Sequence, residues 1–143
     1  MAEAALAPEI IGVPSWEARR AWPLALPLLA PAIALTGGAY EPDDVLADIE
    51  RQNAQLWVVL IGEGVVGAVV STIIVYPRLK SLACPFVGGV DGRLAEWWRP
   101  TFERLEGFAR AKECVRIEGG VRKGWARLLP GMESVGVMLR KDL

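Results

Sequence analysis

The stretch Leu82-Ala83-Cys84-Pro85-Phe86-Val87, followed by Gly88-Gly89-Val90-Asp91-Gly92, decides the fold of this chain. The apolar residues predict a buried strand and the glycine-rich segment predicts a turn. A helical pattern follows from Leu94 to about Lys112, and a second strand pattern over Cys114–Glu118 ends at Gly119-Gly120. We expect the two strands of this βαβ unit to be parallel, because the helix carries the chain back. Ligands in such units bind where a strand end meets a helix start, so the turn is the first candidate site.

The composition indicates a single globular domain over residues 1–143, with a loosely ordered start at residues 1–9. The chain is 52% hydrophobic and 23% charged, which excludes a disordered protein and a coiled coil. Its net charge of −1 does not indicate nucleic-acid binding. Residues 1–75 hold 3 basic and 9 acidic side chains, whereas residues 76–143 hold 13 basic and 8 acidic ones. This asymmetry fits an acidic partner or a phosphorylated cofactor, or two halves that pack together.

Several classes of site are excluded by residue types. The chain has no histidine, which removes Ser-His and Cys-His nucleophile pairs and the usual zinc sites, and we predict no metal site. Cys84 and Cys114 are interpreted as buried small hydrophobes rather than a disulfide. The apolar run Ala21–Leu35 contains three prolines and is shorter than the roughly 20 residues that a membrane span needs. With an acidic start in place of a secretory signal, a cytoplasmic protein is expected.

The remaining elements follow from periodicity and from proline and glycine. Trp98, Phe102, Leu105 and Ala109 form one apolar stripe at helical spacing, and Pro100 predicts that this helix is in two pieces. We further expect the following elements: a strand at Ile10–Val13; a late-starting or bent helix before Leu35, with Leu24, Leu28 and Ile33–Leu35 facing the core; a helix from Pro42 with Val45, Leu46 and Ile49 on its apolar face; a hairpin of Gln55–Ile61 and Val65–Tyr76, with a bulge or close neighbour at Gly67; a short helix at Lys123–Leu129; and a last strand at Ser134–Arg140.

This order of elements resembles that of the GNAT N-acetyltransferases. Val115–Glu118 and the later Pro130-Gly131-Met132-Glu133-Ser134-Val135-Gly136-Val137 are similar to the family's fifth strand and to its Leu-Gly-Phe-Glu-x-Val-Gly segment. The resemblance implies an α+β fold: a mixed, mostly antiparallel central sheet with helices on both faces.

The resemblance also implies where a cofactor and a catalytic base would lie. In active members a glycine loop after the fourth strand holds acetyl-CoA, and the corresponding residues here are Gly88, Gly89, Gly92 and Arg93. The spacing departs from the family's Arg/Gln-x-x-Gly-x-Gly/Ala pattern, and Asp91 places a carboxylate where the phosphates would arrive, so a turn that only reverses the chain is the other interpretation. Arg127 stands where many members have a tyrosine general acid, and an arginine does not donate its proton at neutral pH. Glu118 is the candidate general base, chosen over Glu50 and Glu63.

The departed pyrophosphate motif, an aromatic-containing strand end (Cys84-Pro85-Phe86-Val87), a long charged helix and a compact carboxy-terminal third are similar to features of another group. With these features the chain resembles degenerate GNAT-like internal virion and assembly proteins of short-tailed bacteriophages. This resemblance implies a phage or prophage protein of virion structure or assembly, without a cofactor, whose partners are other virion or assembly proteins or further copies of itself, and which is cytoplasmic or virion-associated. Candidate partner-binding residues are Trp97, Arg122, Lys123, Trp125 and Arg127; alternatively, Trp97 and Trp98 both cover the sheet and the cations form a solvated helix face. Two other hypotheses stay open: an acetyl-CoA-dependent N-acetyltransferase for a small-molecule or protein amine, and a cytosolic binding module.

Overall fold

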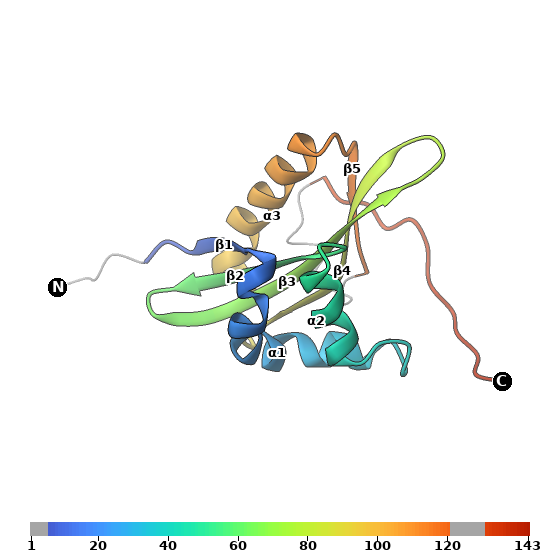
Figure 1. Cartoon of the computed structure of the whole chain (residues 1–143). Coiled ribbons are helices and arrows are strands. Elements are labelled where there is room, and N and C mark those ends of the chain that lie inside the picture. The colour runs from blue at the N-terminus through green and yellow to red at the C-terminus, as the bar shows by residue number, and fades with distance from the viewer. Residues whose placement is uncertain (1–5, 121–130) are drawn as a thin grey trace.

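A computed structural model describes residues 6–120 and 131–143 of the chain. It is an α+β fold with one five-stranded sheet in the order β1-β2-β3-β4-β5 (Figure 1). Strands β1 to β4 pair antiparallel, and β4 pairs parallel to β5, as the βαβ unit predicted. The elements in chain order are β1 (Glu9–Val13), the 3-10 turn η1 (Ser15–Glu17), α1 (Ala18–Ala34), α2 (Pro42–Glu50), β2 (Gln55–Ile61), β3 (Gly64–Val75), β4 (Lys80–Gly89), α3 (Leu94–Ala111) and β5 (Arg116–Glu118).

The helices cover both faces of the sheet, which confirms the expected layers. Helices α1 and α2 lie on one face and α3 lies on the other (Figure 1). Successive side chains of a strand point to opposite faces, and β2 follows this rule. Leu56 and Val58 pack with α1 and α2, whereas Trp57 and Val59 pack with α3. The sheet therefore has an apolar core on each side.

Helix α1 begins earlier than the sequence predicted, and Pro23, Pro27 and Pro31 all lie inside it. The three prolines recur every four residues, so they occupy one face, and all three are exposed. Each lacks an N–H, but the carbonyls that lose a donor lie on this wet face, where water can replace it. The predicted core face was wrong for Leu24 and Leu35, which are exposed. The buried residues are Ala18, Trp22, Ala25, Leu29 and Ile33.

Helix α2 and the β2–β3 hairpin match their predictions closely. Pro42 is the first residue of α2, and the backbone N–H of Glu41 donates to Asp44 Oδ2 at 2.9 Å. The β2–β3 register shifts between Val59 and Leu60, next to the predicted irregularity at Gly67. A Cβ on Gly67 would lie 2.7 Å from the Trp97 ring, so the close neighbour is an indole.

Helix α3 is continuous through Pro100, so the predicted division into two pieces was wrong. Buried residues on both sides of Pro100, including Trp98 and Phe102, hold the helix against the sheet, and their burial outweighs one missing hydrogen bond. The predicted stripe is confirmed, since Trp98, Phe102, Leu105 and Ala109 are all buried. The predicted glycine turn is shorter than expected, because Gly88 and Gly89 belong to β4.

The end of the chain departs from the prediction. Residues 134–140 form no strand; they run extended and exposed beyond the sheet. The predicted helix at Lys123–Leu129 lies outside the described residues. Within residues 6–120 and 131–143, no helix is both long and apolar enough to cross a membrane.

Candidate functional site

The candidate cofactor site is a cavity of about 350 Å³ at the turn between β4 and α3. The exposed proline face of α1 forms one wall of this cavity. The end of β4 and the start of α3 form the opposite wall. The described residues that line it are Pro27, Leu28, Pro31, Gly88, Gly89, Val90, Asp91, Gly92, Leu94 and Trp97. Asp91 is the only charged residue in this set. A cavity of this charge attracts cations rather than phosphate.

Two of the turn's backbone amides are already used within the protein. The N–H of Val90 donates to Val66 O at 2.9 Å, and the N–H of Arg93 donates to Val90 O at 3.2 Å. A phosphate site at a helix start relies on free amides that point at the ligand. Here the amide of Arg93 closes the turn and the amide of Val90 fixes the turn against β3, so neither amide is free to bind a ligand.

Arg93, the cation expected to meet the cofactor, is paired with Glu96 instead. Its Nε lies 2.7 Å from Glu96 Oε2, and its Nη2 lies 3.1 Å from Oε1. This two-point hydrogen bond raises the pKa of Arg93 and lowers the pKa of Glu96. The pair is exposed and lies at the start of α3, with Arg93 just before the helix and Glu96 in its first turn. The positive charge of Arg93 is therefore balanced within the protein.

The glycines at the end of β4 have a packing role. A Cβ on Gly88 would overlap the carbonyl oxygen of Leu28, so this glycine lets α1 lie directly on β4. A Cβ on Gly89 would lie 2.7 Å from the Trp97 ring. Gly92 has a φ of 76°, a left-handed conformation that glycine adopts without strain, and no atom lies within 4 Å of where its Cβ would be. Of the three predicted cofactor glycines, only Gly92 belongs to the turn itself.

Beyond the turn, β4 and β5 part after a short contact. They pair only over Ser81–Ala83 and Arg116–Glu118. The gap beyond is mostly filled by side chains, which leave about 20 Å³ of cavity. Met132 contributes to its wall together with Val87, Trp98 and Phe102. A cavity of about 20 Å³ has room for about one water molecule.

Glu118, the candidate base, has a partner that the sequence did not reveal. The hydroxyl of Tyr76 lies 2.9 Å from Glu118 Oε1 and 3.0 Å from Oε2. The hydrogen bond is the main cause that raises the pKa of Tyr76. Tyr76 follows β3 and Glu118 ends β5, so only the strand order brings them together. The structure places neither residue at the turn that holds Gly92 and Arg93.

The candidate partner-binding residues divide into two groups. Trp97 is completely buried between Gly67, Gly89 and the rest of α3, and Trp98 is buried beside it, so both cover the sheet. Trp97 therefore presents no surface to a partner, which corrects its assignment as an anchor. Arg122, Lys123, Trp125 and Arg127 lie outside the described residues.

The described residues contain no group of three potential metal ligands. Cys84 and Cys114 are free and buried. Burial raises the pKa of the Cys84 thiol to about 12, which leaves it protonated and unreactive at neutral pH. Cys84 is therefore not a candidate nucleophile.

Comparison with solved structures identifies the fold. The chain is similar to a ribosomal-protein-alanine N-acetyltransferase from Brucella melitensis biovar Abortus 2308, with a TM-score of 0.63 and 11% identity over 95% of this chain and 100% of that one. It is similar to the aminoglycoside acetyltransferase meta-AAC0020 from an uncultured soil metagenomic sample, with a TM-score of 0.71 and 11% identity over 95% and 96% of the two chains. It is also similar to a GNAT family acetyltransferase from Staphylococcus aureus, with a TM-score of 0.63 and 12% identity over 96% and 100%.

The chain therefore has the GNAT fold. No family model matches its sequence, and no curated protein matches it either. At 10–14% identity the structural likeness shows the fold alone, and the chemistry must be argued from the residues of this chain.

Proposed function

We propose that this chain uses the GNAT fold as a scaffold, with acetyl transfer lost, and acts in virion structure or assembly of a phage or prophage. The observation that carries the loss of transfer is the charge of the cavity at the β4–α3 turn. Its described lining has one carboxylate, Asp91, and no cation, whereas a CoA pyrophosphate carries negative charge to that place. Acetyl-CoA does not fit these residues.

The state of the nearby groups supports the same proposal. Arg93 is bound to Glu96, two amides of the turn are satisfied internally, and the side chains beside the gap between β4 and β5, Met132 among them, leave a cavity of only about 20 Å³. Each of these would have to be undone before a CoA thioester could be held. The assignment to a phage particle rests on the resemblance to phage proteins in the departed pyrophosphate motif, the aromatic-containing strand end, the long charged helix and the compact carboxy-terminal third. This part of the proposal needs a biological test.

A ligand titration tests the loss of transfer. The full chain is melted with increasing acetyl-CoA up to millimolar concentration, with an active GNAT enzyme as the positive control. A ligand that binds only the folded state raises the melting temperature. We expect an unchanged melting temperature for this chain and an increase for the control. A concentration-dependent increase for this chain would overturn the scaffold proposal.

The location is tested separately. Particles induced from the host that carries the gene are purified and analysed by mass spectrometry, with a host cytoplasmic protein as the contamination control. We expect peptides of this chain at a fixed ratio to a capsid protein. Absence from particles, together with metabolic genes on both sides of the gene, would reject the virion assignment and leave a cytoplasmic binding module.

The second candidate is an acetyl-CoA-dependent N-acetyltransferase for a small-molecule or protein amine. One observation favours it: β4 and β5 pair over only three residues each and then separate. The same titration decides between the two candidates. Binding of acetyl-CoA, followed by release of free CoA in the presence of an amine, would establish this one.

A further inference from the structure

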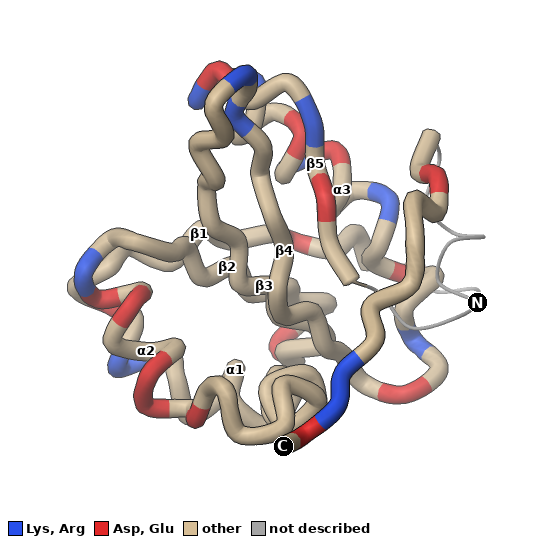
Figure 2. Tube along the Cα trace, turned by 90° about the vertical axis from the view of Figure 1, so that its right-hand side faces the viewer, with Lys and Arg blue, Asp and Glu red and all other residues tan. Residues whose placement is uncertain are grey.

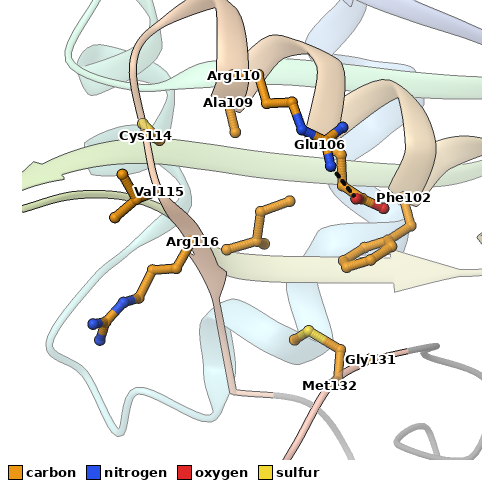
Figure 3. Close-up of a pocket in the computed structure, with 10 residues that line it drawn as sticks. Phe102, Glu106, Ala109, Arg110, Cys114, Val115, Arg116, Gly131 and Met132 are labelled. Atoms are coloured by element: carbon orange, nitrogen blue, oxygen red, sulfur yellow. Dashed lines mark hydrogen bonds and ion pairs between the residues drawn. The ribbon is translucent and has the colours of Figure 1, made fainter.

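The basic and acidic side chains of this chain gather in different halves, and its ion pairs do not join the two. Residues 1–75 hold 3 basic and 9 acidic side chains, whereas residues 76–143 hold 13 and 8. If the halves neutralised each other inside the molecule, ion pairs would connect them. Each ion pair of the described residues instead joins two residues of the same half: Arg19–Glu50, Arg93–Glu96, and Arg110–Glu106, which is drawn in Figure 3. The charge of each half is therefore available to a partner.

Basic side chains dominate the tip of the β3–β4 hairpin, which extends past the rest of the sheet (Figure 1). The tip lies beside the end of α3, because Lys80 Nζ donates to Lys112 O at 2.6 Å. We call residues 75–80 together with residues 110–113 the basic tip. It also exposes apolar side chains, since Val75 is 74% exposed and Tyr76 38%. Four cations stand there against the single carboxylate of Glu113 (Figure 2): Arg78, Lys80, Arg110 and Lys112.

Helix α1 presents an apolar face to the outside. The run Ala21–Leu35 contains no polar side chain, although α1 lies at the surface with only one side on the sheet. Leu24 is 61% exposed and Leu35 69%. The outward residues follow helical spacing: Pro23, Leu24, Pro27, Pro31, Ala34 and Leu35. A contiguous exposed apolar face of this kind marks an interaction surface.

Acidic side chains lie next to this face on α2, which packs beside α1. Residues 15–51 contain six carboxylates and three arginines, and Arg19 is already bound to Glu50. The turn η1, which also packs beside α2, exposes 81% of Trp16. The exposed carboxylates of α2 and its flank are coloured red in Figure 2: Glu41, Asp43, Asp44 and Glu50. We call Trp16, the outward residues of α1 and these carboxylates the α1–α2 surface.

The chemistry of the α1–α2 surface favours one kind of partner. An anionic lipid surface or a nucleic acid would meet the carboxylates of α2 and be repelled. A partner that is apolar and basic at once satisfies both α1 and α2, and the basic tip is such a surface. The tip and the α1–α2 surface lie at opposite ends of the molecule (Figures 1 and 2). They cannot meet within one copy, so the tip must come from a second copy.

We propose that copies of this chain associate head to tail, with the basic tip of one copy on the α1–α2 surface of the next. Val75 and Tyr76 then pack on the apolar face of α1, and Arg78 lies among the carboxylates of α2. The exposed Trp16 offers an aromatic ring to a cation of the tip. Because the two contacting surfaces differ, the association is heterologous and builds a chain or a ring rather than a two-fold dimer. This inference does not depend on whether acetyl-CoA binds or on a role in a virion.

Sedimentation equilibrium of the full chain at low salt tests the proposal with two charge reversals. Arg78→Glu reverses a cation of the tip, and Asp43→Lys reverses a carboxylate of the α1–α2 surface. The average mass of the wild type is expected to rise beyond the dimer with concentration and to fall with added salt. Each reversal is expected to weaken association by about tenfold, because an exposed attraction is replaced by a repulsion. A wild type that is monomeric at hundreds of micromolar, or that stops at a dimer, would overturn the proposal.

Matched controls separate the two surfaces from net charge. Arg99→Glu on the exposed side of α3 changes the net charge as Arg78→Glu does, and Glu63→Lys in the β2–β3 turn changes it as Asp43→Lys does. Both controls are expected to associate like the wild type. If each control weakened association as much as its counterpart, net charge alone would be responsible and the two surfaces would be refuted.

A mixture of the two weakened variants gives the sharpest test. Arg78→Glu keeps an intact α1–α2 surface and Asp43→Lys keeps an intact tip, so together they contain one unaltered contact. Association in the mixture is expected to be about tenfold tighter than in either variant alone, which also shows that both variants are folded. A mixture no tighter than its components would refute the contact. A monomeric wild type that binds phosphatidylserine vesicles, with binding lost in Arg78→Glu, would assign the tip to a lipid surface instead.

Discussion

The hydroxyl of Tyr76 donates to both carboxylate oxygens of Glu118, at 2.9 and 3.0 Å, across 42 positions of the sequence. The long β3–β4 hairpin carries Tyr76 past the end of the sheet, and the parallel pairing of β5 with β4 places Glu118 within reach. The carboxylate that was the best candidate for a catalytic base is therefore engaged by a phenol of the same chain.

We predict that Tyr76 titrates above its ordinary range and that Glu118→Gln brings its pKa down. The hydrogen bond to the carboxylate is the main reason that the pKa of Tyr76 is raised, and the glutamine removes the charge. Because the folded state holds this proton more tightly than the unfolded state, the contribution to stability is complete below about pH 10 and is lost as the pH rises through the folded pKa. Ultraviolet titration of phenolate absorbance measures the shift, with Tyr40→Phe in both proteins to isolate Tyr76.

An unchanged titration curve in Glu118→Gln would contradict the hydrogen bond. The control is Glu113→Gln, which removes a carboxylate that lies before β5 rather than at its end and that is not among the causes of the shift in the pKa of Tyr76. It should leave the curve where it is in the wild type.

The pairing of Arg93 with Glu96 predicts a gain of anion binding. In the double variant Asp91→Asn with Glu96→Gln, the cavity loses its carboxylate and Arg93 loses its partner, so phosphate groups meet a cation and no opposing charge. We expect acetyl-CoA, or CoA alone, to raise the melting temperature of this variant at concentrations that do not affect the wild type. Arg93→Gln added to the double variant should abolish the increase.

The salt dependence of that gain is an internal check. Binding that arises from charge at an exposed turn weakens as ionic strength rises. An increase in melting temperature that persists unchanged in high salt, or that survives Arg93→Gln, would show that CoA binds elsewhere.

Close packing of α1 on β4 predicts that Gly88→Ala is destabilising. The added methyl would overlap the carbonyl oxygen of Leu28, and backbone on both sides must separate to admit it. We expect a loss of about 3 kcal/mol in the free energy of unfolding. The matched control is Gly107→Ala, at an exposed position of α3 with nothing within 4 Å of the new methyl, where helix propensity predicts a gain of up to about 1 kcal/mol.

Urea unfolding of the three proteins measures both changes. If Gly88→Ala were as stable as the wild type, then Gly88 would not be the contact that lets α1 approach, and a role in the turn would return as the explanation for this glycine.

The helices and strands that the sequence predicted correctly are those whose burial pattern is local. Trp98, Phe102, Leu105 and Ala109 keep helical spacing across Pro100, so the stripe was visible even though the continuity of the helix was not. Helix α1 was misjudged because three prolines suggest a break, and only their common solvent face explains why the helix tolerates them. The order of the elements and the parallel pairing of β4 with β5 followed from the residues, and the resemblance added the mixed sheet with helices on both faces.

The candidate site was less predictable, because it depends on contacts between distant segments. The sequence does not show whether a glycine is needed for a turn, for a bound phosphate or for a close neighbour. In the structure, Gly88 lies against Leu28 and Gly89 lies against Trp97. No sequence pattern around Tyr76 predicts its hydrogen bond with Glu118, which lies 42 positions further along the chain. The last strand was predicted at Ser134–Arg140, but these residues pair with no described strand, so they form none.

A buried hydrogen-bond chain under α3 gives the last prediction. The indole N–H of Trp57 donates to Ser71 Oγ at 2.9 Å, and the Ser71 hydroxyl donates to Gln55 Oε1 at 2.8 Å. Ser71 is fully buried, so Ser71→Ala leaves the indole N–H without a partner and without water. The expected loss is about 1–3 kcal/mol, the cost of an unsatisfied buried donor.

Ser81→Ala is the control for this prediction, because Ser81 is equally buried but its hydroxyl makes only a 3.5 Å contact with Arg116 O. A contact at the limit of hydrogen-bond distance contributes less, so its loss should stay below about 1 kcal/mol. Urea unfolding with a common slope gives both values. Equal losses in the two variants would mean that the volume of the hydroxyl, rather than its bond to Trp57, sets the stability at Ser71.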